Sequence, residues 1–524
     1  MPRSYLIQGI LAGGSAAFGY GIGFVLQWLW SYLGLPFLSR GAGRRLRNAA
    51  LLLCLAVAIL SLWWAADWQN SIRLLWGMQP LQTGEPIWLG LIALVFCAIL
   101  LLLGHLFART YRVLSRLLDC YVPPRVSRVI GAVLAIALFW SLAEGIFFKG
   151  VLRVMDSSLR ELDAAMEDNL AVPTDPMKTG SAASLIRWDD LGRQGRRYIA
   201  SGPSAADIGS FFQGQALEPI RVYVGLNSAE TASARAALAL EELKRNGAFE
   251  RSALVVVVPT GTGWVDPAAL DPLEYLHHGD VASVAVQYSY LSSWLSLLVQ
   301  PDYGADAATA LFQAVYRYWT SLPHDHRPKL YLYGLSLGAL NSQLSADLLD
   351  VIADPFQGAL WSGPPFQSRM WNTITANRNP GSPAWLPRFR DGAVIRFTNQ
   401  NNALDIPGAE WGPMRIVYLQ YASDAVTFFD ARSFYRQPDW MQEPRGPDVS
   451  PRLRWFPVVT MLQLAVDMMI ATTSPMGYGH VYAPEHYIDA WMAVTDPPNV
   501  TKDDAARLKA LLAPRFRPGL DVGG

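Results

Sequence analysis

The stretch YLYGLSLGALNSQ, residues 331–343, decides the fold that this sequence predicts. A β-rich run at 329–333 meets Gly334-Leu335-Ser336-Leu337-Gly338 and continues as a helix-like segment. A serine between two glycines at the end of a strand is typical of a sharp strand–turn–helix, because glycines leave room for the turn. The Ser336 hydroxyl would project from the carboxyl end of the strand, where the next helix directs its backbone N–H groups. Ser336 is therefore the candidate nucleophile.

Strands and helices alternate on both sides of this turn. Continuous β-branched runs at 253–258 and 281–287 are typical of strands that are buried on both faces. Helical patterns cover 228–246 and 304–321. The other expected strands are 221–226, 357–362, 393–398 and 414–420. This alternation predicts an α/β fold with a mainly parallel sheet.

A serine nucleophile needs a base, and in this arrangement the histidine comes last in the chain order of serine, acid and histidine. The histidines that follow Ser336 are His480 and His486. His480 lies in a Gly- and Pro-rich loop, whereas His486 lies at the start of a predicted helix. Because such a base sits on a loop above the sheet, His480 is the expected base.

The acid should follow a strand on the carboxyl side of Ser336. Asp424 comes directly after the strand at 414–420 and is the expected acid. Asp405 and Asp430 are the alternatives. No clear strand is visible in the sequence between Asp424 and His480, so the choice of acid stays open.

Two backbone N–H groups are needed to stabilise an oxyanion. One is expected from Leu337, the residue after the nucleophile. The other is expected from Thr260 or Gly261, in the loop after the strand at 253–258. The Gly-Thr-Gly of this loop lacks a following Lys-Ser/Thr, and the pattern G-x-G-x-x-G fails at Asp266. Nucleotide binding is not expected.

Histidine pairs elsewhere do not predict a metal site. His277-His278 and His324-Asp325-His326 are near neighbours without a further cluster of ligands. Neither a metal nor another cofactor is expected. The formal net charge is zero, so nothing indicates nucleic acid as a partner.

The N-terminal third has the composition of a membrane region. The 524-residue chain is 51% hydrophobic and only 16% charged, and the apolar excess lies before residue 150. Four stretches approach or exceed the roughly 20 apolar residues that span a bilayer. They are 9–35, 49–68, 87–107 and 129–148. The first is rich in glycine, which permits close helix packing in lipid.

Arginines predict the orientation of these spans. They cluster in the loops after the first and third spans, whereas the loop at 69–86 carries only Arg73. Because positive loops stay in the cytoplasm, both the N-terminus and the part after the fourth span are expected on the extracytoplasmic side. The predicted location is a bacterial inner membrane, crossed several times. A missing upstream hydrophobic segment would explain the unusual N-terminus.

Three regions follow from these patterns. Residues 1–150 are the expected transmembrane region, 151–215 a juxtamembrane helix and linker, and 216–524 the catalytic domain. An apolar stripe from Leu152 to Met166 supports the juxtamembrane helix. The aromatic and aliphatic run at 288–299 is interpreted as core, with an acyl pocket or lipid contact as the alternative.

Long segments of the chain resemble a bacterial family of predicted membrane-anchored α/β-hydrolases. They are YLIQGILAGGSAAFGYGIG (5–23), PIRVYVGLNSAETASARAALALEELKRNGAFER (219–251), RPKLYLYGLSLGAL (327–340), YLQYASDAVTFF (418–429) and GYGHVYAPEHYIDAW (477–491). The resemblance implies the α/β-hydrolase fold with Ser336 as nucleophile, and no defined substrate. Relatives often have Glu where Leu335 stands.

The expected function is that of a membrane-anchored serine hydrolase, similar to a carboxylesterase or lipase, acting on an apolar or acylated substrate. Ser336, His480 and Asp424 would form and resolve an acyl-enzyme. One alternative is an acyltransferase with the same triad. Another is a non-catalytic membrane protein that retains the fold. The sequence does not indicate the oligomeric state.

Overall fold

The computed structural model describes residues 1–37, 39–148, 163, 165–167, 170–291, 301–347 and 351–516. The chain divides into two units. Unit 1 is Met1–Met155 with Ala431–Gln437 and Asp448–Asp467, and unit 2 is Asp156–Asp430 with Pro438–Pro447 and Met468–Gly524. Two segments that follow Asp424 in the chain therefore belong with the N-terminal region and interrupt the contiguous domain expected at 216–524.

Unit 2 is built on a parallel β-sheet. Within the described residues the sheet has seven strands in the order β1-β3-β2-β4-β5-β7-β6, and every pair is parallel. The strands are β1 (Ile220–Val224), β2 (Ala253–Val258), β3 (Val281–Val286), β4 (Lys329–Leu335), β5 (Gly358–Ser362), β6 (Ile395–Thr398) and β7 (Arg415–Leu419). All residues of β2 and β3 are buried, as their continuous apolar runs predict. The predicted α/β class is confirmed.

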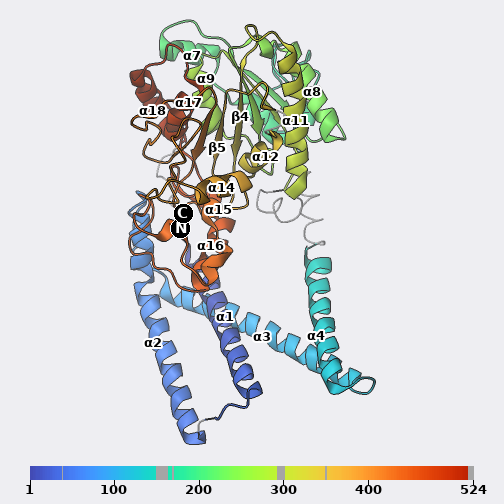
Figure 1. Ribbon diagram of the computed structural model, residues 1–524, viewed down its shortest axis with the longest axis vertical. Helices are drawn as coiled ribbons and strands as arrows, with labels where there is room; N and C mark the ends of the chain where they lie inside the picture. Colours follow the sequence, from blue (N-terminus) through green and yellow to red (C-terminus); the bar gives the residue numbers. More distant parts are fainter. Residues whose placement is uncertain are drawn as a thin grey trace. The chain divides into compact units, whose positions relative to one another are not determined.

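Helices cover both faces of this sheet (Figure 1). One face carries α8 (Ala232–Arg245), α11 (Pro301–Ser321) and α12 (Leu337–Ser345), and the other carries α9 (Pro267–Leu276), α17 (Pro484–Thr495) and α18 (Lys502–Phe516). Shorter helices are α6 (Gly192–Ala200), α7 (Ala205–Phe212), α14 (Arg369–Ala376) and α15 (Ala425–Phe428). The carboxyl ends of the strands meet at one edge, where loops after β2, β4, β5 and β7 come together.

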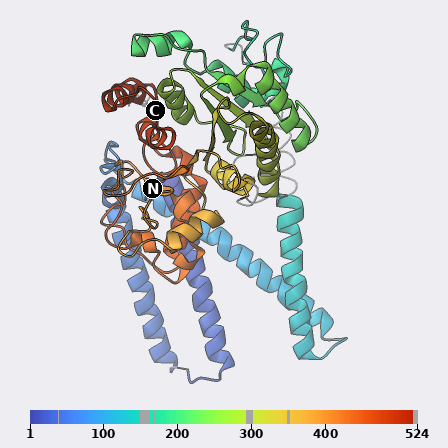
Figure 2. The ribbon, with the colours of Figure 1, turned by 45° about the horizontal axis from the view of Figure 1, so that its top comes forward.

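Unit 1 contains the predicted spans. Within the described residues, four helices are long and apolar enough to cross a membrane. They are α1 (Tyr5–Tyr32), α2 (Arg40–Arg73), α3 (Pro86–Leu118) and α4 (Pro124–Ser141), and α4 continues into a π-helical turn at Leu142–Phe148. Figure 2 shows α1 and α2 joined by a short loop and α3 running obliquely to them. Large apolar side chains along these helices are exposed.

Close packing of α1 on α3 depends on two glycines. A Cβ at Gly13 would lie 2.4 Å from the Ala93 carbonyl oxygen, and one at Gly9 would lie 2.8 Å from Ile92 Cβ. A Cβ at Gly21, by contrast, would meet nothing within 4 Å. The glycine-rich pattern therefore does serve helix packing, but only at its N-terminal end.

We call residues 431–437 and 448–467, the two later segments of unit 1, the insert. Most of α16 (Val459–Met469) lies in the insert. Asp467 accepts hydrogen bonds from Arg3 Nε and Nη2, both at 2.7 Å. The indole of Trp76, just after α2, donates to the Asp448 carbonyl oxygen at 2.9 Å. These contacts hold the insert against α1 and the end of α2.

Two predicted features fall partly outside the described residues. Of the apolar stripe from Leu152 to Met166, only Met166 is described, and it is exposed. Of the run at 288–299, residues 288–291 are described. Tyr288, Tyr290 and Leu291 are buried there, as the core interpretation predicts, and residues 292–299 lie outside the described residues.

Candidate active site

Ser336 lies in a strained turn between β4 and α12. Its φ and ψ are 58° and −125°, in a region that non-glycine residues rarely adopt. The two flanking glycines are sterically required. A Cβ at Gly338 would lie 2.2 Å from the Val258 carbonyl oxygen, and one at Gly334 would lie 2.4 Å from the Gly338 carbonyl carbon. Strain of this kind is held only where surrounding structure enforces it, and it clusters at functional sites.

Asp424 and His480 are brought together although 56 residues separate them. His480 Nδ1 lies 2.7 Å from Asp424 Oδ2. Asp424 is fully buried and caps α15, where its Oδ1 accepts from the Val426 N–H at 2.9 Å. The His480 loop is tied to the same place, because the Gly479 N–H donates to Ser423 Oγ at 2.9 Å.

The Asp424 carboxylate has two further side-chain donors that sequence reasoning missed. The Tyr482 hydroxyl donates to Oδ2 at 2.7 Å, and the Thr427 hydroxyl donates to the same oxygen at 3.1 Å. Burial raises the pKa of Tyr482 well above its ordinary value, and the adjacent Asp424 carboxylate adds to this effect. Tyr482 therefore stays protonated and remains a donor. The only signal in the sequence was a tyrosine two positions after the histidine.

Ser336 and His480 both lie over the end of β5. The Ser336 N–H donates to the carbonyl oxygen of Ser362, the last residue of β5, at 2.9 Å. The next residue is Gly363, where a Cβ would lie 2.8 Å from His480 Cε1. The other ring nitrogen, His480 Nε2, is buried and has no hydrogen-bond partner among the described residues. The imidazole thus has one nitrogen bound to a carboxylate and the other available near the turn.

The alternative residues lie elsewhere. His486 is on α17, and its Nδ1 pairs with the Tyr421 hydroxyl at 2.5 Å. Tyr421 in turn stacks on Tyr482, with ring centroids 4.4 Å apart. Asp405 is exposed on the loop after β6, which is the edge strand of the sheet, and Asp430 is partly exposed. Asp424, on the loop after β7, is the one of these carboxylates that contacts His480.

Thr260 and Gly261, two of the candidate oxyanion donors, lie in the loop directly after β2. The Thr260 N–H donates to the Trp264 carbonyl oxygen at 3.0 Å, and so closes the turn of its own loop. The Thr260 N–H is therefore engaged within its own loop. Leu337 is the first residue of α12, and the N–H of a first helical residue has no partner within its helix.

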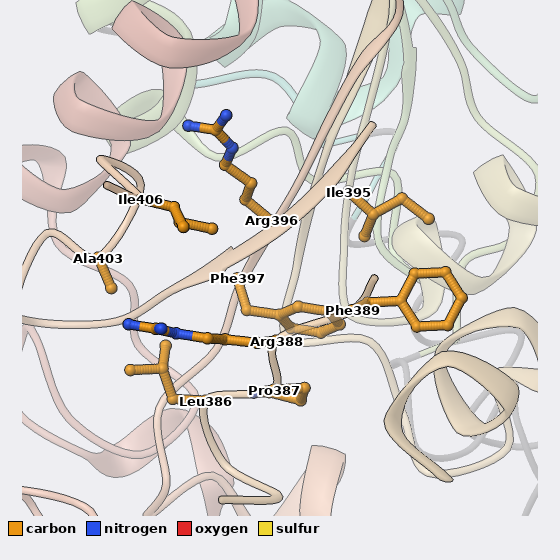
Figure 3. A pocket seen from close by; sticks show the side chains of 9 residues that line it. All are labelled: Leu386, Pro387, Arg388, Phe389, Ile395, Arg396, Phe397, Ala403 and Ile406. Carbon is orange, nitrogen blue, oxygen red and sulfur yellow. The ribbon is translucent and has the colours of Figure 1, made fainter. Parts of the chain in front are cut away.

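The pockets found in unit 2 do not include these residues. A pocket of about 50 Å³ lies at β6 and is lined by Phe389, Ile395 and Phe397, among others (Figure 3). An open groove of about 630 Å³ lies between the loop at 379–388 and residues 444–447. The smaller pocket has room for a few water molecules only.

A parallel sheet with a serine at a strained strand–helix turn, followed by an Asp–His pair above neighbouring strands, defines the α/β-hydrolase class of fold. Sequence comparison agrees. The chain belongs to the alpha/beta-hydrolase family, whose model matches residues 220–508. The model of the N-terminus of that family matches residues 1–203. A search of curated proteins finds no match.

Proposed function

We propose that this protein is a membrane-anchored serine hydrolase that cleaves an ester bond, in the manner of a carboxylesterase or lipase. The hydrogen bond of 2.7 Å between His480 and Asp424 carries the proposal, because it leaves Nε2 buried and unpartnered beside the Ser336 turn. That is the orientation a general base needs to accept a proton from a serine hydroxyl.

The reaction proceeds in two acyl transfers. Ser336 Oγ attacks the ester carbonyl carbon while its proton passes to His480 Nε2, and the Leu337 N–H with an N–H of the loop at Thr260 and Gly261 stabilises the oxyanion. The C–O bond then breaks, and His480 returns the proton to the leaving alcohol. Water attacks the acyl-enzyme by the same route, which releases the acid and restores Ser336. Asp424 holds the imidazole tautomer throughout.

Aromatic side chains near Asp424 favour an apolar acyl group as substrate. Phe366 and Phe429 are half-buried, and their ring centroids lie 4.9 Å apart. The Phe366 N–H donates to the carbonyl oxygen of Val426, two residues after Asp424, at 3.0 Å. Trp264, in the loop that supplies Gly261, is 38% exposed. Such surfaces bind aliphatic chains through the hydrophobic effect, so we expect an acylated small molecule or a lipid.

The catalytic unit faces the extracytoplasmic side of a bacterial inner membrane in this proposal. The arginine-rich loops after the first and third spans favour that side. Alkaline phosphatase fused after Gly524 should be active in a bacterial host, and an inactive fusion would contradict the orientation.

A fluorophosphonate probe tests the chemistry on the full chain. We expect covalent labelling of the wild type at Ser336 and none of Ser336→Ala. Turnover of p-nitrophenyl esters should then increase with acyl length over the shorter chains. Labelling with negligible hydrolysis would favour transfer to an acceptor other than water. No labelling of the wild type would mean that the fold has lost its chemistry.

A further inference from the structure

The insert contacts the α1 region at two places. At one end, Asp467 is bound to Arg3, just before α1 begins. At the other end, the Val458 N–H donates to the Phe434 carbonyl oxygen at 2.8 Å, and the Phe434 ring meets Phe18 of α1 edge-on. The centroids of the two rings are 5.7 Å apart. The insert therefore contacts α1 both just before its first turn and near its middle.

Phe18 must lie at the depth of the lipid chains if α1 spans the bilayer. The helix has 28 residues and is about 42 Å long at 1.5 Å per residue. The hydrocarbon layer takes up roughly 20 of these residues. Phe18 is in the middle of α1, so every possible placement of the layer leaves it at least about 7 Å inside. The Phe434 ring, in contact with Phe18, reaches the same layer.

The exposed side chains of the insert suit this location. Tyr435 is 68% exposed and Phe456 is 59% exposed, which would be unfavourable in water. Arg432, Arg436 and Arg454 are also exposed. Arginine with aromatic residues is a composition typical of the membrane interface, because long basic side chains extend toward lipid phosphates while rings stay among the upper acyl chains.

We propose that the insert is a re-entrant segment, which enters the lipid leaflet at the end where α1 begins. Its partner is phospholipid: Tyr435 and Phe456 contact acyl chains, and the arginines contact headgroup phosphates. The insert lies in the chain between Asp424 and His480, so the stretch that joins these two residues passes through the bilayer surface. The inference concerns lipid contact and stands independently of the reaction at Ser336.

Quenching of a fluorophore by lipid tests the depth. Cys54, Cys97 and Cys120 are first replaced by alanine in the full chain. Single cysteines at Tyr435 and Phe456 then carry an environment-sensitive dye, in nanodiscs that contain phosphatidylglycerol and phosphatidylethanolamine with brominated acyl chains. The control sites are Leu52, 68% exposed on α2, and Leu217, 49% exposed in unit 2. Tyr435 and Phe456 should be quenched several-fold more than Leu217 and approach Leu52, whereas quenching equal to Leu217 would overturn the proposal.

A second measurement uses the unchanged sequence and avoids any effect of substitution on folding. Phospholipids with a diazirine in the acyl chain are photolysed in the same nanodiscs, and cross-linked peptides are identified by mass spectrometry. We expect cross-links in 431–437 and 452–458 as well as in α2. Cross-links in α2 with none in the insert would rule out the re-entrant segment.

Discussion

Units 1 and 2 use hydrophobic residues in opposite ways. In unit 2 the apolar runs of β2 and β3 are buried on both faces of a sheet. In unit 1, α2 contains a long apolar stretch and yet has no buried residue, because lipid takes the place of a protein core. The absence of side chains at Gly9 and Gly13 lets α1 pack closely on α3. Each unit also has a buried carboxylate, which is paired with Arg3 at Asp467 in unit 1 and with His480 at Asp424 in unit 2.

The comparison implies that each unit is vulnerable to a different kind of change. Added volume should damage unit 1 at its close helix contact, since no flexible neighbour can move aside there. A change of charge or of one hydrogen bond should damage unit 2 at its site, since buried polar groups are costly to leave unpaired. The predictions below separate these two sensitivities, from the largest effect to the smallest.

Ser336→Ala should lower turnover by about four to six orders of magnitude, because members of a catalytic triad act as a unit. The thermal unfolding of the protein should barely change. Ser345→Ala, at the last residue of α12 and also buried, is the matched control and should keep activity. Activity of Ser336→Ala at a tenth of the wild-type rate would rule out Ser336 as nucleophile.

Asp424→Asn should cost about 10⁴-fold in kcat, because the imidazole loses its orienting acceptor and takes the wrong tautomer. His480→Ala should be as harmful as the loss of Ser336, and His486→Ala should be mild. Asp405→Asn is the control for the carboxylate, since Asp405 is exposed after the edge strand. If Asp405→Asn proved the harmful change, the acid would belong to the loop after β6.

Gly13→Leu should destabilise unit 1 by about 3 kcal/mol, at the upper end of the usual cost of overpacking. The atoms that the new side chain would meet are backbone atoms of α3 and cannot rotate away. Gly21→Leu adds the same volume where nothing lies within 4 Å, and it should be tolerated. Thermal unfolding in nanodiscs measures both, and equal melting temperatures would show that the α1–α3 contact does not limit stability.

Tyr482→Phe should reduce kcat roughly tenfold with little change in KM, because a hydrogen bond to a charged group is worth about 1.5–3 kcal/mol. Other titratable groups near Asp424 and His480 are Tyr421 and, on α17, His486 and Tyr487, and they are unchanged in this variant.

Tyr331→Phe removes an equally buried hydroxyl, which donates to the Thr495 carbonyl oxygen far along the chain. This control should leave kcat unchanged. A Tyr482→Phe variant with the kcat of the wild type would assign Tyr482 a structural role only.

Asp266→Asn should alter how stability depends on pH. Burial raises the pKa of Asp266 to about 7, so below that pH the folded chain holds a proton that the unfolded chain has lost. Stability therefore falls as pH rises, by about 1.4 kcal/mol between pH 6 and pH 8. Asparagine keeps the cap of α9 and cannot ionise. Between about pH 6 and pH 8, the melting temperature of the variant should fall less than that of the wild type. An unchanged pH dependence would contradict the prediction.

Periodicity and apolar runs predicted most of the fold because each strand of a covered parallel sheet is apolar throughout. The run at 253–258 became β2 without change of bounds, and Ser336 fell between β4 and α12. The order of the last two strands was beyond the sequence. The chain goes first to edge strand β6 and returns to β7 beside β5, and no local pattern encodes which strand lies outside.

Site residues could be predicted from the sequence where their position next to a strand or loop identifies them. They could not be predicted where their role depends on contacts with distant residues. Asp424 and His480 were chosen from their positions after a strand and on a loop, and the structure brings them within hydrogen-bond distance. Their roles in catalysis remain predictions. The turn that occupies the Thr260 N–H and the donation from Tyr482 to Asp424 both depend on tertiary geometry. The sequence shows no clear strand between Asp424 and His480, and the structure, which describes every residue of this stretch, has none there, because part of the stretch packs with the helices of unit 1.

The interleaving of the two units has a consequence for how such a protein can be inherited. The coding sequence of unit 2 cannot be separated from that of unit 1 at a single position. Residues 431–437 and 448–467 pack with α1 and α2, but in the chain they lie within the sequence of unit 2. A unit 2 transferred alone would carry Phe434 without α1, whose Phe18 it contacts. We therefore expect units 1 and 2 to have evolved together, with each unit constraining substitutions in the other.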